Sequence, residues 1–193
     1  MVAPVAQSTS VASNHALNHA LIERFAQAAR AAWTTVERVE TSAAAIAAAV
    51  RRAAPAAQRI AVAQPLDLPA ELFAECRRLP GVLGSPATKS QLATADLGIT
   101  DAFAGVASSG SVCIAIDEGD AGAISLLPRM HIAVVAASAI VARPRDLFGP
   151  GAAGNHGLRR NFVFITGPSA TADMGPLVRG VHGPHRLHIV VLV

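Results

Sequence analysis

The chain has 193 residues, with 16 basic and 13 acidic side chains, two cysteines, no tyrosine and a mean hydropathy of +0.42. This length suits a single domain with its own hydrophobic core, which needs no disulfide or zinc ion to fold. Two cysteines are too few for an iron–sulfur cluster or a Cys-rich zinc site, so we expect no cofactor and no metal in this chain. Cys76 and Cys113 are interpreted as small core residues of a reduced, cytoplasmic protein.

The composition also argues against a membrane protein and a nucleic-acid-binding protein. The apolar fraction of 52% is raised by 42 alanines, and no apolar run reaches the ~18 residues needed to span a bilayer. The N-terminus lacks a basic residue followed by an apolar core, so it does not resemble a secretory signal. The basic residues are 15 arginines and one lysine, scattered and accompanied by few aromatic residues, which does not favour a nucleic-acid groove.

The first third of the chain is predicted to be mainly helical. Residues 1–14 are small and polar and are predicted to form a disordered arm, ahead of a single α/β domain over residues 15–193. Apolar spacing, a Ser42 N-cap and flanking prolines predict three helices, at residues 15–33, 43–54 and 69–79. Short apolar runs predict two strands, at residues 35–40 and 60–63.

The second half is predicted to be rich in strands. Its apolar runs are rich in valine and isoleucine and do not alternate with polar residues, a pattern typical of strands that are covered on both faces. These runs occupy residues 97–100, 112–116, 131–136, 162–166 and 187–193. The chain is therefore predicted to have an α/β fold, in which helices flank a sheet of these strands.

A first candidate site is the loop Ser109, Gly110 and Ser111, directly before a predicted strand. Glycine lets a ligand approach the backbone closely, and the serine hydroxyls supply hydrogen bonds. The alternative is an ordinary turn that leads into a strand.

A second candidate site follows the strand that ends at residue 166. Gly167 and Pro168 form a turn, after which Ser169 or Thr171 is predicted to cap a helix with Asp173 in its first turn. Free amides at the beginning of a helix favour an anion, and the ends of parallel strands are where open α/β sheets bind ligands. The alternative is a helix cap that binds nothing.

A third candidate site contains His182 and Gly183, just before the last strand. His182 lies between glycines, so it is interpreted as a polar ligand group or as a turn residue bonded to the backbone. His182, His185 and His188 are three residues apart, but Pro184 and the alternation of the following strand do not place them on one face, so no metal site is predicted. His131, at the start of a strand, is interpreted either as a site residue or as a structural residue bonded to a carbonyl.

Three segments together resemble the lactate utilization protein C family (LutC/YkgG, the LUD domain). They are LGITDAFAGVASSGSVCIAI, SLLPRMHIAVV and GPSATADMGPLVRGVHGP, in the order of the family and covering about residues 95–193. The resemblance implies a Rossmann-like sheet of the NagB/RpiA/CoA-transferase type. It also implies a role in oxidising L-lactate to pyruvate beside iron–sulfur partner proteins. The free amides expected in the second candidate loop add a small anionic metabolite as the expected ligand.

The chain departs from the family pattern at three places. Gly122 stands where an arginine is common, Ser108 replaces a usual glutamate, and the stretch at Gly175 is one residue short and lacks a glutamate. Loss of these charges leaves open whether the site still works. We therefore keep two alternatives to a lactate-utilization component: an independent CoA- or nucleotide-dependent enzyme of the same fold, and a degenerate ligand-binding regulator. His182 and Asp173 are the candidates for a catalytic role, and a homodimer is left open.

Overall fold

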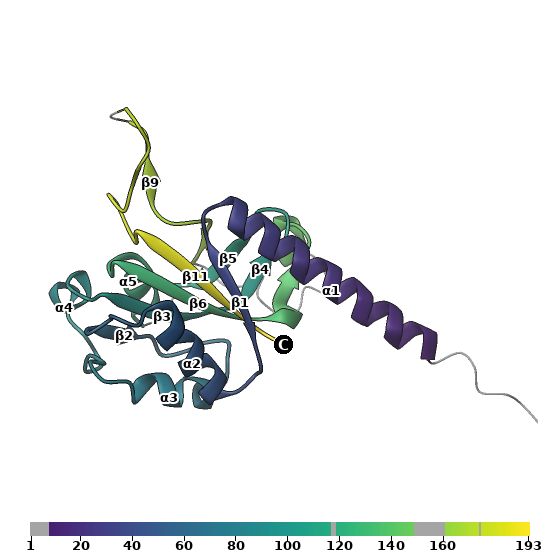
Figure 1. Ribbon diagram of the computed structural model, residues 1–193, viewed down its shortest axis with the longest axis horizontal. Helices are drawn as coiled ribbons and strands as arrows, with labels where there is room; N and C mark the ends of the chain where they lie inside the picture. Colours follow the sequence, from purple (N-terminus) through teal and green to yellow (C-terminus); the bar gives the residue numbers. More distant parts are fainter. Residues whose placement is uncertain (1–7, 117–118, 149–160, 174) are drawn as a thin grey trace, which may run out of the picture.

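A five-stranded parallel sheet forms the centre of the molecule (Figure 1). The computed structural model describes residues 8–116, 119–148, 161–173 and 175–193. The strand order is β1 (Thr35–Val39), β11 (Arg186–Leu192), β6 (Met130–Ala136), β3 (Leu97–Ala102) and β2 (Ile60–Val62). All neighbouring pairs are parallel, so the predicted α/β class is confirmed. The NagB/RpiA type stays a prediction.

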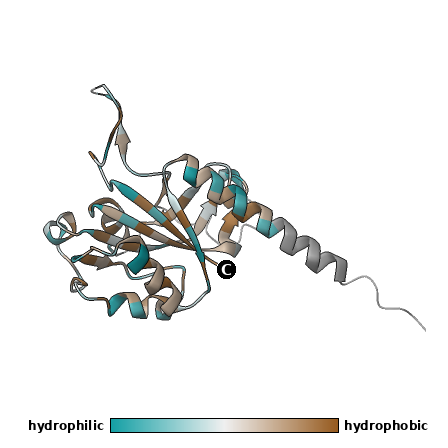
Figure 2. Ribbon diagram, in the orientation of Figure 1, coloured by the Kyte–Doolittle hydropathy of each residue, from teal (hydrophilic) through white to brown (hydrophobic). Residues whose placement is uncertain are grey.

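Both faces of the sheet are covered at its central strands β6 and β11, which explains their long apolar runs. Alternate residues of β6 enter separate hydrophobic clusters: Ile132 and Val134 pack on one side, and Ala133 and Val135 on the other. In Figure 2 hydrophobic colour is seen along these central strands.

Helices α1 (Ser8–Ala31) and α2 (Ala43–Ala53) lie on opposite faces of the sheet. The predicted N-cap of α2 is confirmed, because the Ser42 hydroxyl accepts a hydrogen bond from the Ala45 amide at 3.2 Å. The third predicted helix is divided into the 3₁₀ turn η1 (Ala70–Phe73) and α3 (Ala74–Arg77). Helix α1 begins at Ser8, so it includes residues 8–14 of the predicted arm, whereas residues 1–7 lie outside the described residues.

Two of the predicted strands do not belong to the parallel sheet. They form a second, four-stranded sheet with the order β7 (Ile140–Val141), β4 (Ala104–Val106), β5 (Ser111–Ala115) and β8 (Phe162–Ile165). The chain passes from β3 into β4 through a single residue, Phe103, so the two sheets are joined by almost continuous extended backbone. β8 lies at the edge of the second sheet and Phe164 is 42% exposed, so the prediction of a strand covered on both faces is wrong there.

The predicted helix after Gly167 is also wrong. The residues that follow form a two-stranded antiparallel hairpin, β9 (Ala170–Thr171) and β10 (Val178–Arg179), which extends away from the sheets in Figure 1. The Arg179 guanidinium lies 5.6 Å from the centre of the Trp33 ring, just after α1. The remaining short elements are α4 (Lys89–Ala93), α5 (Ala121–Leu126), η2 (Ala137–Ala139) and η3 (Pro144–Leu147).

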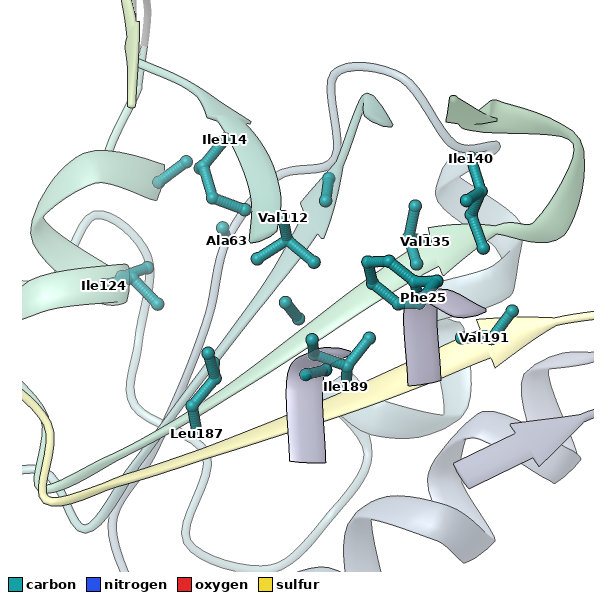
Figure 3. Packing of buried hydrophobic residues seen from close by; sticks show 14 of the residues in the cluster. Phe25, Ala63, Val112, Ile114, Ile124, Val135, Ile140, Leu187, Ile189 and Val191 are labelled. Carbon is teal, nitrogen blue, oxygen red and sulfur yellow. The ribbon is translucent and has the colours of Figure 1, made fainter. Parts of the chain in front are cut away.

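Figure 3 shows how α1 and α5 join the two sheets through one hydrophobic cluster. Phe25 of α1 is completely buried and belongs to the same cluster as Val112 of the second sheet and Val135 of the parallel sheet. Ile124 of α5 is buried in this cluster as well. Among the described residues, no helix combines the length and the apolarity needed to cross a membrane.

Candidate functional site

A cavity of about 520 Å³ lies between the second sheet and the parallel sheet. One wall is formed by β8 and the loop 166–169, and another by α5 together with Ile116. The loop 182–184 and the amino-terminal ends of β6 and β11, at His131 and Leu187, complete the lining. The cavity therefore lies at the amino edge of the parallel strands, whereas the sequence-based expectation placed a site at their carboxyl edge.

The structure brings the second and third candidate loops together at this cavity. Gly167, Pro168, Ser169, His182 and Gly183 all line it. The Ser169 amide donates to the Pro184 carbonyl at 2.9 Å, and the His182 amide donates to the Ser169 hydroxyl at 3.3 Å. Two segments 13 residues apart are thus held side by side by hydrogen bonds.

These same bonds change what the second loop can bind. We expected free amides at the beginning of a helix to hold an anion, but no helix follows Gly167 in residues 161–173 or 175–193. The Ser169 amide is already engaged by Pro184, and the Ala170 backbone pairs with Arg179 in the hairpin. The hydroxyl of Ser169 and the imidazole of His182 are two polar groups that this loop pair offers to a ligand.

The first candidate loop lies behind the cavity wall. The Ser111 hydroxyl is 2.6 Å from the hydroxyl of Thr166, a cavity residue, and 2.6 Å from the hydroxyl of Ser109. Gly110 has φ +69°, and a Cβ atom there would lie 2.1 Å from the Ala29 nitrogen of α1. The absence of a side chain at Gly110 therefore lets helix α1 approach the loop closely, and not a ligand as the sequence suggested.

Thr171 and Asp173 lie on the hairpin and do not line the cavity. The Thr171 hydroxyl donates to the Asp173 carboxylate at 3.0 Å, and Asp173 is exposed. Of the three positions where the chain departs from the family pattern, Gly122 lines the cavity and Ser108 and Gly175 are exposed. Asp117 and Glu118, an acidic pair after β5, lie outside the described residues.

His131 is the most buried polar residue at the cavity. Its side chain has no exposed surface, and its Nε2 atom shares a hydrogen bond of 2.9 Å with the Thr100 hydroxyl. The partner is thus a hydroxyl and not the predicted carbonyl. Its Nδ1 atom is buried without a hydrogen-bond partner. Burial lowers the pKa of His131 from 6.5 to about 3, so the imidazole is neutral at physiological pH.

Sequence reasoning missed most of the apolar lining of the cavity. Part of this lining comes from β8, and its apolar run predicted a strand but gave no sign that one face of the strand borders a cavity. Thr166, the first residue of the second candidate segment, also lines the cavity.

A second, larger hollow of about 810 Å³ lies at the carboxyl edge of the parallel sheet, beside the ends of β1, β6 and β11. The general rule for open α/β sheets favours this edge. However, the ten candidate residues predicted from the sequence do not line this hollow. The one guanidinium in its described lining, that of Arg38, is 2.6 Å from the Glu23 carboxylate and is therefore already paired.

The fold and the cavity define an α/β protein with a parallel sheet, a smaller second sheet and a largely apolar cavity between them. The family model of the LUD domain matches residues 22–192, and the chain belongs to this family. The resemblance stated from the sequence motifs is thereby confirmed.

Two curated relatives are both named lactate utilization protein C. The protein from Shouchella clausii is 38% identical over 110 residues, which cover 53% of this chain and 46% of that protein. The protein from Halalkalibacterium halodurans is 40% identical over 103 residues, which cover 51% of this chain and 44% of that protein. The matched segment therefore spans less than half the length of these relatives.

A solved structure extends the similarity to almost the whole fold. The crystal structure of a DUF162 family protein from Deinococcus radiodurans matches with a TM-score of 0.68 and 26% identity. The match covers 91% of this chain and 98% of that chain.

Proposed function

We propose that this chain is a component of L-lactate utilization that acts in the oxidation of L-lactate to pyruvate beside iron–sulfur partner proteins. Membership of the LUD domain family and the names of the relatives support this role. We further propose that the chain binds a small molecule in this role. The observation behind this is the cavity where the second and third candidate loops meet. A cytoplasmic location and a homodimer stay predictions.

The cysteines support a role in which other proteins carry the electrons. Oxidation of lactate to pyruvate releases two electrons, which need an acceptor. Cys76 and Cys113 are completely buried, and burial raises their pKa values to about 11 and 12, so both thiols are protonated at physiological pH. Iron–sulfur clusters are bound by thiolates, and these two residues lie in separate hydrophobic clusters. The donor set of the described chain thus does not suit such a cluster.

Within this role, His182 and Ser169 are the groups proposed to orient a bound molecule. Both line the cavity, His182 is exposed, and the hydrogen bond between them fixes the backbone of His182. The imidazole of His182 carries ring nitrogens that can donate or accept a hydrogen bond, so His182 can hold a polar group of the ligand.

Growth on L-lactate tests the proposal. Deletion of the gene should abolish growth on L-lactate but not on pyruvate, and the wild-type gene should restore it. A gene carrying His182→Ala should restore growth only partly, because the cavity loses a polar group. His19→Ala is the matched control, since His19 is an exposed histidine that lines the other hollow.

Normal growth of the deletion strain, with the partner genes intact, would contradict the role in lactate utilization. If His19→Ala impairs growth and His182→Ala does not, the functional site lies at the carboxyl edge of the sheet. Either result is visible without knowledge of the ligand.

A further inference from the structure

We propose that the cavity between β8 and α5 binds an uncharged, largely apolar small molecule whose polar group forms a hydrogen bond with Nδ1 of His131. This inference rests on the proposal that the cavity is the small-molecule site of the chain. It replaces the anionic ligand expected from the sequence with a different class of ligand.

The apolar rim of the cavity is the first observation. Ile116 and Leu126 line the cavity and are 37% and 52% exposed. Apolar side chains that gather at the mouth of a concave site mark a place where another apolar surface binds. Deeper in, Val163, Ile165 and Leu187 continue the apolar lining.

The charges of the lining are the second observation. Among its described residues there is no arginine, lysine, aspartate or glutamate, and the titratable groups are the imidazoles of His131 and His182. A carboxylate or phosphate placed here would lose water without gaining a counter-charge from the described lining, which is unfavourable. An uncharged ligand avoids this desolvation.

The third observation is the unpartnered nitrogen of His131. The ring is on the face of β6 that it shares with Ala133 and Val135, which pack toward α1 and the second sheet. Nε2 is occupied by Thr100, whereas Nδ1 is buried and lacks a partner. Buried polar atoms are normally hydrogen-bonded, so this nitrogen has an unused capacity for a hydrogen bond at a residue that lines the cavity. Because the imidazole is neutral at pH 7, it offers a hydrogen bond but no counter-charge.

Two fluorescent probes with the same ring system test the class of ligand. N-phenyl-1-naphthylamine is uncharged, apolar and carries one N–H group, and 1-anilinonaphthalene-8-sulfonate is the same molecule with an added sulfonate. The purified full-length chain should bind the uncharged probe at one saturable site, and the sulfonate about tenfold or more weakly. Equal or tighter binding of the sulfonate, or no saturable binding of the uncharged probe, would overturn the proposal.

Variants then test the location. Leu126→Ala should weaken binding of the uncharged probe severalfold, because it removes an exposed apolar side chain at the rim. Leu66→Ala is the matched control, since Leu66 is 38% exposed and does not line the cavity. If the two variants bind alike, the probe does not occupy this cavity and the proposal fails.

His131→Leu tests the hydrogen bond. A folded His131→Leu protein should bind the uncharged probe about tenfold more weakly, and unchanged affinity would exclude the contact. His131→Gln keeps a polar group at this position and should retain more affinity than His131→Leu. If His131→Leu does not fold, the comparison of His131→Gln with wild type decides, because Gln cannot reproduce the imidazole geometry and must weaken binding.

The probe experiment and the growth experiment fail separately. Probe binding at the cavity, combined with normal growth of the deletion strain, would contradict the role in lactate utilization but support an uncharged, apolar ligand. A growth defect combined with preferred binding of the sulfonate would leave the role and overturn the ligand class.

Discussion

His131 shows how a single residue can be concealed in a strand. It lies within an otherwise apolar run, so its neighbours predict a buried strand and give no sign of its partner. Thr100 is 31 residues away in the sequence and becomes its neighbour only because β3 and β6 are paired in parallel. The prediction that His131 bonds a carbonyl was wrong for this reason. The residues around His131 do not reveal which strand pairs with β6, and therefore not which side chain lies beside the imidazole.

Burial of a neutral imidazole makes the stability of the fold depend on pH. In the unfolded chain His131 has a pKa near the ordinary value of 6.5, and in the folded chain burial lowers the pKa to about 3. Below the unfolded value, the unfolded state takes up a proton that the folded state does not, so stability is lost as the pH falls from 6.5 toward 3. The slope approaches about 1.4 kcal/mol per pH unit.

We expect this dependence to appear in a comparison of wild type with His131→Gln. Urea unfolding at pH 7 and pH 5 should show that the free energy of unfolding of wild type, relative to the variant, falls by about 2 kcal/mol. The other titratable groups are the same in both proteins, so their contributions cancel in the difference. A difference that stays constant between the two pH values would show that His131 takes up a proton in the folded state.

At the scale of elements, the sequence predicts what local patterns determine. The Ser42 cap, the apolar runs of β3, β6 and β11, and the stop of α2 before Pro55 depend on neighbouring residues and were confirmed. β5 has the same apolar character as a parallel strand, so nothing local assigns it to a second sheet. The segment after Gly167 has the composition of a helix cap, but it becomes a hairpin through bonds to Gly180 and Pro184.

The candidate site follows the same division. The loops with Ser169 and His182 were identified from their composition, because glycine, proline and small polar residues mark loops that carry function. Their meeting at one cavity depends on the tertiary fold. The role of Gly110 could not be predicted from its loop. The composition of the loop suggests a ligand site, whereas Gly110 lies against the backbone of α1 at Ala29.

Gly110 yields a prediction for the contact between α1 and the second sheet. Gly110→Ala combines a left-handed backbone with a clash against Ala29, so it should lower the free energy of unfolding by about 3 kcal/mol. Gly119→Ala is the matched control, since Gly119 has φ +77° and nothing lies within 4 Å of its added Cβ. It should cost only about 1 kcal/mol, for the backbone conformation alone. Equal losses in chemical denaturation would show that α1 moves away from Gly110 at no cost.

For the whole molecule, the question is whether the two sheets unfold together. β3 continues through Phe103 into β4, and Phe25 of α1 packs in a cluster to which both sheets contribute. Among the described residues, the apolar cluster that belongs to the small sheet alone consists of few residues around Phe103 and Leu147, too few for a core that is stable by itself. We therefore expect a single cooperative unit.

The two cysteines can measure this cooperativity directly. Cys76 reports on the cluster between α2, α3 and the parallel sheet, and Cys113 reports on the second sheet. Both are completely buried, so a thiol reagent modifies each one only when its surroundings open. Iodoacetamide labelling across a urea series, followed by mass spectrometry of the two cysteine peptides, should give opening free energies that agree within about 0.5 kcal/mol. Labelling of Cys113 at clearly lower urea would mean that the second sheet, and with it the wall of the cavity, opens while the parallel sheet stays folded.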